Sequence, residues 1–366
     1  MKFRCERDRL VEALGTAARA AVGRAAVGAA LPGIQLNLVG GKLAVTGTDQ
    51  DLTIVSAVDV SGGEDGAVVV PGRLITDIAR ALAPGAVAVS GDEQELQLSA
   101  GRSQFVLRPY RVADFPHVRA SGGPVVSLPT SGLAEALRQV VRAASSEDTR
   151  PVLTGVLVAS EAEGLRLVAT DSYRLAVKDL PAATGVLAED QKVLVPSRAL
   201  SELQRLLVGE SPVGMRLGGR ELTFGVGSVQ LTTRLIEGEF PPYRQLIPFN
   251  HPNRLVVPKE PFLEAIRRVR LVARDATTPV RISLRQDTIQ LSVVTTDWGQ
   301  AAEDVDAKYE GSEMTIAFNP QYLADGVEAI TGDEVALETV DSLKPATLKP
   351  LDHPDYIYLL MPVRVA

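Results

Sequence analysis

The sequence predicts an α+β protein made of three tandem copies of one domain. Two observations carry this prediction. Short segments recur in the same order about every 125 residues of the 366-residue chain, and helical and strand periodicities alternate within each interval. Solenoid and propeller repeats have periods of roughly 20–50 residues. A unit of this length is therefore a whole domain.

Three independent sets of segments define the repeat. The first is a Thr-Asp pair, the second an apolar helical segment and the third a Glu-Ala-Leu or Glu-Ala-Ile triplet. Their positions are Thr48-Asp49, Thr170-Asp171 and Thr296-Asp297; VPGRLITDIARAL from Val70, VPSRALSELQRLL from Val195 and FNPQYLADGVEAI from Phe318; and Glu12-Ala13-Leu14, Glu135-Ala136-Leu137 and Glu264-Ala265-Ile266. Phe115-Pro116 and Phe240-Pro241 form a partial fourth set. Chance supplies one such pair easily, but not three sets in one phase.

Each copy reads as two helices among roughly eight short strands. A strand-like stretch leads into an amphipathic run, and in copy three Phe262, Ile266 and Val269 follow helical spacing. Thr130-Ser131 and Pro261 are the expected starts of first helices. Pro71-Gly72, Pro196-Ser197 and Pro320 are expected to open the second helices, because proline is tolerated in a first helical turn. We expect an antiparallel sheet with both helices on one face.

Loops rich in turn residues mark the expected boundaries near Ser121-Gly122-Gly123-Pro124 and Asn250-His251-Pro252-Asn253. The resulting domains span 1–120, 125–248 and 254–366. No apolar run approaches the roughly 20 residues of a membrane span, and the charged start MKFRCERDRL is unlike a signal peptide. We therefore expect a cytoplasmic protein. The single cysteine, Cys5, excludes an internal disulfide framework and is expected as a small apolar residue of a first strand.

The net charge of −7 is concentrated in copy three, where residues 251–366 carry 12 basic and 18 acidic side chains. This argues against tight binding of nucleic acid over the whole surface but leaves room for a local basic face. Arg73 and Arg80, and likewise Arg198 and Arg205, are seven residues apart and so share a helix face. Solvation and nucleic-acid contact both remain open for these arginines. The second helix of copy three has instead Asp325 and Glu328 and no basic residue.

The sequence carries no sign of an enzyme. His117, His251 and His353 lie near prolines without a nucleophile or metal partner, and zinc-binding spacings and a phosphate-binding loop are absent. The repeated Thr-Asp pair could be a catalytic carboxylate set. The favoured interpretation is a turn in which the aspartate accepts backbone N–H groups. We expect no cofactor and no metal.

The start MKFRCERDRL, the segment ATDSYRLAV and the end LLMPVRVA together resemble the bacterial DNA polymerase III β subunit, the sliding clamp. The resemblance covers the whole chain, and its most specific parts are Thr170-Asp171-x-x-Arg174-Leu175 and Met361-Pro362-Val363-Arg364. It implies clamp-type domains in a head-to-tail dimeric ring, with helices inside and sheets outside. The implied partners are encircled duplex DNA and a second copy of the chain, together with the replicative polymerase, the clamp loader and repair polymerases, which bind through short peptides.

The resemblance also implies residue roles. The implied DNA-binding residues are Arg24, Arg73, Arg80, Arg138, Arg142, Arg150, Arg198, Arg205, Arg267 and Arg268. The implied peptide-binding pocket comprises Leu153, Thr170, Ser172, Tyr173, Arg174, Leu175, Pro241, Leu246, Asn319, Tyr322, Leu343, Pro345, Leu360, Met361, Pro362, Val363 and Arg364. Core packing is the alternative for Leu153, Leu175 and Leu246. Ring closure is expected between Phe105 and Leu107 of one chain and Leu271 and Val272 of the other.

Some positions depart from the family pattern. Ser172-Tyr173 stand where Gly-His is frequent, Gln245 where a basic residue can occur, and Pro345 where a small polar residue is usual. These departures leave a specialised second clamp, insensitive to a pocket-binding inhibitor, as an alternative. Further alternatives are a repeat-domain scaffold that binds only proteins and, last, a hydrolase or transferase.

Overall fold

The computed structural model describes residues 1–21, 33–118, 122–128, 130–181, 183–209, 212–248, 250–273 and 278–364. These residues form two compact units. The first comprises 1–130 with 198–235, and the second 131–197 with 236–366. Every strand pairing found in the described residues is antiparallel.

The first unit holds two sheets. The smaller has the order β5-β1-β7-β8-β9: Ser61–Glu64, Lys2–Glu6, Ala86–Gly91, Leu96–Ala100 and Ser103–Leu107. The larger has the order β10-β15-β16-β17-β4-β3-β2-β6: Val126–Leu128, Val213–Gly218, Glu221–Val226, Val229–Arg234, Leu52–Asp59, Lys42–Thr48, Gly33–Val39 and Gly66–Pro71.

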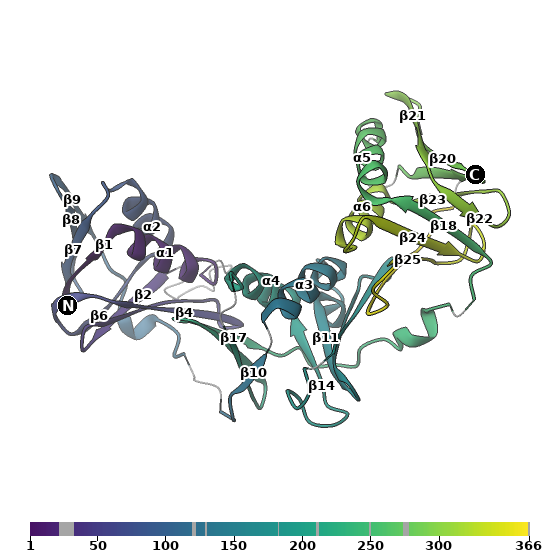
Figure 1. Ribbon diagram of the computed structural model, residues 1–366. Coiled ribbons are helices and arrows are strands. Elements are labelled where there is room, and N and C mark those ends of the chain that lie inside the picture. The colour runs from purple at the N-terminus through teal and green to yellow at the C-terminus, as the bar shows by residue number, and fades with distance from the viewer. Residues whose placement is uncertain are drawn as a thin grey trace. The chain divides into compact units, whose positions relative to one another are not determined.

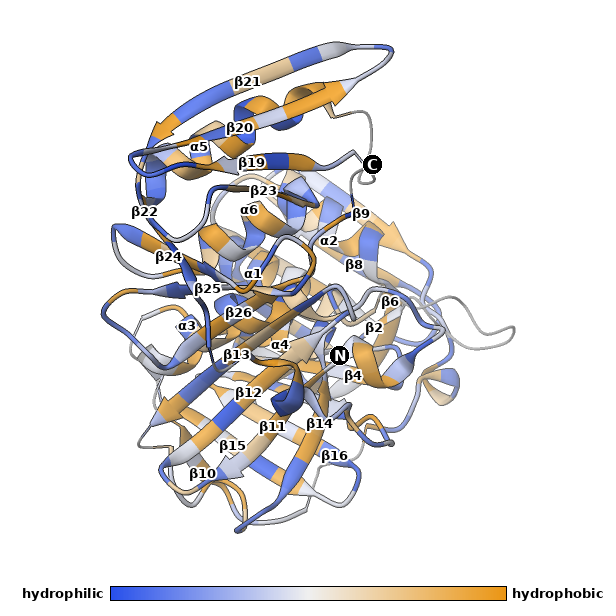
Figure 2. Cartoon of the chain, turned by 90° about the vertical axis from the view of Figure 1, so that its right-hand side faces the viewer, coloured by the Kyte–Doolittle hydropathy of each residue, from blue (hydrophilic) through white to orange (hydrophobic). Residues whose placement is uncertain are grey.

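The second unit also holds two sheets. The larger has the order β14-β11-β12-β13-β26-β25-β24-β18-β22: Lys192–Pro196, Gly155–Glu161, Gly164–Thr170, Arg174–Pro181, Tyr356–Leu360, Ala346–Pro350, Glu334–Thr339, Asn253–Pro258 and Lys308–Glu310. The smaller has the order β21-β20-β19-β23: Gly299–Asp306, Thr288–Thr295, Val280–Leu284 and Met314–Phe318. Buried and partly exposed residues mix along β11–β13, where Figure 2 shows hydrophobic and hydrophilic residues interspersed.

Within the described residues, two α-helices fall in each copy, as the sequence predicts. They are α1 Arg7–Ala18, α2 Gly72–Ala81, α3 Thr130–Val140, α4 Ser197–Leu206, α5 Lys259–Val269 and α6 Pro320–Ala329. The Glu-Ala-Leu and Glu-Ala-Ile triplets all lie in the first helix of their copy. The apolar members of the triplets are at most 1% exposed. The repeated triplets thus mark the same buried face three times.

The expected proline positions need correction in three places. Pro71 and Pro196 are the last residues of β6 and β14, so they precede the helices rather than open them. Pro261 is the third residue of α5, which begins at Lys259. Of these four prolines, Pro320 is the one that stands at the first position of its α-helix. Proline has no backbone N–H. It is therefore tolerated at the end of a strand as well as in the first turn of a helix, because neither position requires that donor.

The expectation of a single sheet per copy is also corrected, because the strands of each copy divide between two sheets. In copy one, α1 and α2 pack into one core with strands of both sheets (Figure 1). Leu14 and Ile75 come from the helices, Phe3 from β1 and Leu36 from β2, each no more than 2% exposed. Cys5 lies in β1 and is 9% exposed, as expected, and its burial raises the pKa of the thiol to about 11.

The two larger sheets each join strands from neighbouring copies. In the first unit β4 of copy one pairs with β17 of copy two, with Thr53 opposite Thr232. In the second unit β13 of copy two pairs with β26 of copy three, with Leu175 opposite Leu359. The compact units therefore cut across the repeat, because hydrogen-bonded sheets cross from one copy to the next. Within the described residues, no helix has the length and apolar character to cross a membrane.

Candidate functional site

The repeated Thr-Asp pair forms a turn directly after a strand. In copy one, Asp49 Oδ1 accepts from the backbone N–H groups of Asp51 and Leu52 at 3.1 and 2.8 Å. In copy two, Asp171 Oδ1 accepts from those of Tyr173 and Arg174 at 2.9 and 3.0 Å. The expected role of these aspartates as acceptors of backbone N–H groups is confirmed. Within the described residues, no group of acidic, His or Cys side chains could hold a metal ion.

Both turns place a residue with a side chain at positive φ. Gln50 has φ of 79° and Ser172 has φ of 80°. Their N–H groups donate to Thr48 Oγ1 and Thr170 Oγ1 at 3.0 and 3.1 Å. This left-handed conformation is costly for a residue with a Cβ, and the surrounding hydrogen bonds hold it in place.

Copy three departs from the expected register. The threonine at the end of its matching strand β20 is Thr295, not Thr296. Thr295 Oγ1 accepts from Trp298 N at 3.3 Å, and Thr295 pairs across the turn with Gly299. This turn is one residue shorter than in the other copies, where Thr48 pairs with Thr53 and Thr170 with Leu175. The Thr-Asp pair of copy three is therefore offset by one position from its counterparts.

The C-terminal tail is bound to both copies of the second unit. Beyond β26, Met361 N donates to Tyr173 O at 2.9 Å, in the turn of copy two. Val363 N then donates to Ala317 O of β23, in copy three, at 2.7 Å. These backbone hydrogen bonds place the Met361–Arg364 segment beside the Thr170–Arg174 turn.

Arg174 links this turn to α6. Its Nε donates to Asp171 Oδ2 at 2.9 Å and its Nη1 to Asp325 Oδ2 at 2.6 Å. Its Cζ lies 4.3 Å from the centre of the Tyr322 ring, and the Tyr173 ring stacks on Tyr322 at a centroid distance of 6.5 Å. The side chain of Arg174 is only 10% exposed. A guanidinium and two aromatic rings thus form one stacked group.

Burial and the charged groups around Arg174 shift the pKa values of Arg174 and Tyr322. Burial by itself lowers the pKa of the guanidinium, but the Tyr358 hydroxyl and the Asp325 and Asp171 carboxylates more than offset it, and the net pKa is raised. Burial, and then the Asp171 carboxylate, raise the pKa of the Tyr322 hydroxyl. Arg174 therefore stays charged and Tyr322 neutral at physiological pH.

The residues implied for peptide binding all lie in the second unit, and their exposure differs. Leu153, Thr170, Leu175 and Leu360 are at most 6% exposed. Leu175 packs in a core with Leu359 and Tyr243, as the core alternative for it predicts. Tyr173, Leu246, Leu343 and Met361 are 59%, 52%, 62% and 42% exposed. Pro241, Asn319, Tyr322, Pro345, Pro362 and Val363 are partly exposed, and Ser172 and Arg364 are exposed.

Asn319 and Ser172 also have hydrogen-bond partners within the second unit. Asn319 caps α6, and its Oδ1 accepts from Gln321 N and Tyr322 N at 2.9 and 3.1 Å. Ser172 Oγ accepts from Arg150 Nη1 at 2.9 Å. Sequence reasoning missed Asp325 as a partner of Arg174, although it noted the acidic character of α6. One indirect signal for this pair is present in the sequence: the second helix of copy three is acidic, whereas the second helices of copies one and two carry arginines.

Most of the arginines implied for DNA binding form ion pairs with carboxylates. Arg24 lies outside the described residues. Arg73 and Arg80 share a helix face as predicted, since they lie 3.8 and 3.9 Å from the same carboxylate, that of Asp77. Their side chains are 96% and 60% exposed. The remaining pairs are Arg142 with Glu328, Arg150 with Glu147, Arg198 with Asp49, Arg205 with Glu202, Arg267 with Glu264 and Glu328, and Arg268 with Glu264 and Glu303.

The guanidinium of Arg138 donates to two backbone carbonyls of copy three. Its Nη1 and Nη2 bind Glu328 O and Ala329 O, both at 3.1 Å, at the end of α6. The cation therefore satisfies carbonyls that the helix itself leaves without a partner. Together with the pair of Arg142 and Glu328, it ties copy two to copy three.

The residues expected at a subunit interface lie on an edge strand and in a short turn after a helix. Phe105 and Leu107 lie on β9, an edge strand, and Leu107 is only 6% exposed because it belongs to the copy-one core. Val106, which the sequence did not single out, is 54% exposed. Leu271 is 76% exposed and Val272 partly exposed in the short 3-10 turn Arg270–Val272 after α5.

Family models for the N-terminal, central and C-terminal domains of the DNA polymerase III beta subunit match residues 1–119, 127–242 and 244–364 in succession. The chain belongs to this family. The resemblance inferred from the sequence is thereby confirmed, as is the α+β fold with three clamp domains.

Curated relatives and solved structures agree over the full length. The chain is 36% identical to the beta sliding clamp of Streptomyces coelicolor over 100% of both chains. It is 32% identical to that of Staphylococcus aureus over 100% of this chain and 99% of the relative. A Pseudomonas aeruginosa sliding clamp bound to griselimycin has a TM-score of 0.91 at 29% identity, and the Bacillus subtilis sliding clamp has 0.90 at 27%, each over 100% of both chains. All four are members of the sliding-clamp family.

Proposed function

We propose that this chain is a non-catalytic DNA sliding clamp, which closes as a dimer around duplex DNA and tethers replication and repair proteins. One observation carries the proposal: three clamp domains in order, matched along the whole chain to relatives named as beta sliding clamps. Three domains in each of two chains supply six similar sectors of a ring. Closure also removes sheet edges that would otherwise aggregate.

Two free sheet edges support a head-to-tail closure. In the isolated chain, β9 and β21 are edge strands of their sheets, and such strands present unpaired N–H and C=O groups. Arg102 and Arg108 flank β9, whereas β21 carries Glu303, Asp304 and Asp306, and Figure 2 shows hydrophilic segments along β21. We infer that β9 of one chain pairs with β21 of the next. The exposed Leu271 and Val106 add apolar surface beside this contact.

The pairing of these arginines with carboxylates favours weak, sliding contact with DNA over tight binding. Phosphate binding by a few arginines is weak, salt-sensitive and independent of sequence. Carboxylate partners such as Asp77 for Arg73 and Arg80, and Glu202 for Arg205, further reduce the net positive charge offered to the phosphates. A closed ring needs no more affinity, because its topology keeps it on the DNA.

Partner proteins are proposed to bind at the stacked group of Tyr173, Arg174 and Tyr322 and at the tail from Met361 to Arg364. Exposed apolar side chains there, among them Leu246, Leu343 and Met361, offer contacts for the apolar anchors of an extended peptide. The proposed partners are the replicative polymerase, the clamp loader and repair polymerases. The buried residues Leu175 and Leu360 would support the site from below rather than touch the peptide.

The decisive experiment compares retention on circular and linear DNA. The protein is loaded onto nicked circular duplex DNA and separated by gel filtration, and the DNA is then cut once by a restriction enzyme. Retention on the circle and loss after cutting would demonstrate a topological link. Equal retention on both forms would overturn the proposal.

A specialised clamp with an altered peptide site is the second candidate, favoured by Ser172 and Tyr173. Ser172 carries a side chain at φ of 80°, and Tyr173 stacks on Tyr322. A relative from Bartonella birtlesii was also solved bound to griselimycin. If these side chains narrow the site, S172G/Y173H should bind griselimycin more tightly than the wild type by calorimetry. Equal affinities would remove this candidate.

A further inference from the structure

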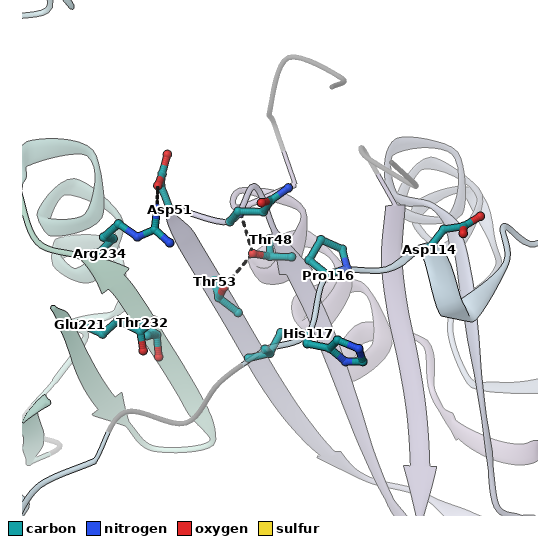
Figure 3. Close-up of a pocket in the computed structure, with 11 residues that line it drawn as sticks. Thr48, Asp51, Thr53, Asp114, Pro116, His117, Glu221, Thr232 and Arg234 are labelled. Atoms are coloured by element: carbon teal, nitrogen blue, oxygen red, sulfur yellow. Dashed lines mark hydrogen bonds and ion pairs between the residues drawn. The ribbon is translucent and has the colours of Figure 1, made fainter. Parts of the chain in front are cut away.

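A pocket of about 460 Å³ lies in the first unit, where strands of copies one and two join. Thr53 of β4 and Thr232 of β17 line it, as do Glu221 of β16 and the neighbouring residues Asp114 and 116–118. Figure 3 shows Asp51 and Arg234 together at one side, with Pro116 and His117 at the other. Its volume falls within the range of ligand-binding pockets, roughly 300–1,000 Å³.

The backbone around this pocket has the same frame as the proposed peptide site, meaning the same hydrogen bonds and strand pairings. Arg234 N donates to Asp51 O at 2.9 Å, and in the second unit Met361 N donates to Tyr173 O at the same distance. The two turns close in the same way, through Asp49 N to Leu52 O at 3.1 Å and Asp171 N to Arg174 O at 3.3 Å.

The strand registers agree as well. Thr53 faces Thr232 across β4 and β17, as Leu175 faces Leu359 across β13 and β26. Pro116, which lines the pocket, stands in the repeated Phe-Pro segment whose second copy contains Pro241. The pocket is thus the copy-one and copy-two counterpart of the site between copies two and three.

The side chains on this common frame have opposite chemistry. Asp51 stands where the other site has Tyr173, Arg234 where it has Met361, and Thr53 where it has Leu175. Thr53 and Thr232 therefore place hydroxyl groups where the other site has Leu175 and Leu359. Thr53 Oγ1 lies 2.7 Å from Thr48 Oγ1, and Thr232 Oγ1 lies 2.8 Å from Thr223 Oγ1. At these positions the pocket is polar, while Pro116 and Val118 add apolar surface to another part of its lining.

The charges favour a basic occupant. Glu221, Asp114 and Asp51 bring three carboxylates to the lining, against the single guanidinium of Arg234. Arg234 lies 3.6 Å from Asp51, and their side chains are 61% and 74% exposed. An exposed pair of this kind is weak, so an incoming ammonium or guanidinium group can compete for Asp51.

We propose that this pocket is a second docking site of the clamp, which takes an extended peptide segment with lysine or arginine side chains spaced by small polar ones. The inference rests on the proposed peptide-binding function, because it transfers that frame to the first unit. The carboxylates bind the basic side chains of the peptide. The hydroxyl groups of Thr48, Thr53 and Thr232 form hydrogen bonds with its backbone and its small polar side chains. A partner could then engage one clamp through an apolar motif at one site and a basic segment at the other.

The test uses two fluorescein-labelled hexapeptides, acetyl-(Lys-Ser)3-amide and acetyl-(Glu-Ser)3-amide, titrated with the full-length protein at low salt by fluorescence anisotropy. The lysine peptide should bind and the glutamate peptide should not. Glu221→Lys should weaken binding of the lysine peptide about tenfold or more, because like charges then meet in the pocket. Glu313→Lys makes the same charge change at an exposed turn outside the lining and should have little effect.

Thr232→Trp adds a variant that fills the pocket without changing its charge, and it should also abolish binding. Equal binding of both peptides, preference for the glutamate peptide, or equal loss in the Glu221 and Glu313 variants would overturn the proposal. Deletion of residues 361–366 separates it from the proposed function. The deletion should abolish binding of an apolar polymerase-derived peptide and leave the lysine peptide bound. Loss of both would mean that the lysine peptide uses the other site.

Discussion

Arg174 and Asp325 form an ion pair 2.6 Å long that joins β13 of copy two to α6 of copy three. Their side chains are only 10% and 15% exposed, and Asp171 pairs with the same guanidinium. The acidic second helix of copy three, which looked like the loss of a basic face, is therefore the anionic partner of copy two. Glu328 of the same helix likewise pairs with Arg142 of copy two, and it also pairs with Arg267 of its own copy.

Removal of one partner should destabilise the second unit. Arg174→Ala leaves Asp325 and Asp171 buried without their cation, and we expect a loss of about 3 kcal/mol in the free energy of unfolding. Urea unfolding followed by circular dichroism measures it. Arg285→Ala, at an exposed turn, is the control. A loss for Arg174→Ala no larger than for this control would show that the pair contributes nothing.

The tail should be required for peptide binding but not for the fold. Deletion of residues 361–366 removes the hydrogen bonds from Met361 N to Tyr173 O and from Val363 N to Ala317 O, worth about 1 kcal/mol each. We expect binding of polymerase-derived peptides to fall below detection in calorimetry. The dimer should remain, as judged by light scattering, and unchanged peptide affinity would refute the site.

Ring closure should depend on Leu271. A charge at this 76% exposed position would be buried without a partner in the proposed interface, so Leu271→Glu should shift the protein from dimer to monomer in sedimentation velocity. Val208→Glu is the matched control, because Val208 is 79% exposed and lies outside the proposed contact. Dissociation by both variants, or by neither, would argue against this interface.

The exposed arginines should set the salt dependence of DNA binding. The double variant Arg73→Ala/Arg80→Ala removes two exposed cations from α2. Its affinity should fall equally for all DNA sequences, and the slope of log K against log salt should decrease by up to about 2. Fluorescence titration of duplex DNA measures both quantities. The slope should stay unchanged in Arg285→Ala.

Acid should weaken the contact of copy two with copy three. The Arg142 guanidinium, and after it Arg267, lowers the pKa of Glu328 below its ordinary value of 4.5. The folded state thus holds the ionised form, so this contribution to stability is present above about pH 4.5 and is lost as the pH falls through the lowered pKa. The pair is partly exposed, which limits its contribution to about 1 kcal/mol or less. Urea unfolding at several pH values should give a shallower acid dependence for Glu328→Gln.

The local pattern predicted some of the site and missed the rest for a physical reason. Thr170, Asp171 and Arg174 lie within one turn, so their spacing alone indicated the hydrogen bonds that Asp171 makes. Asp325 lies 151 residues from Arg174, and no local period connects the two. The short turn of copy three was missed because Thr295 and Thr296 are adjacent and identical in type. Arg138 read as a surface cation, yet its carbonyl partners belong to another copy.

The sequence by itself determined the threefold repeat, the two helices of each copy, the burial of the repeated triplets and the family. These follow from periodicity and from short segments, which local backbone geometry and the need to bury apolar side chains enforce in every copy. Only the tertiary structure decided that neighbouring copies share sheets, that the acidic α6 neutralises arginines of copy two, and that one backbone frame occurs twice with opposite side-chain chemistry. Strand pairing and ion pairs join residues far apart in the chain, and the local sequence pattern does not predict which residues will pair.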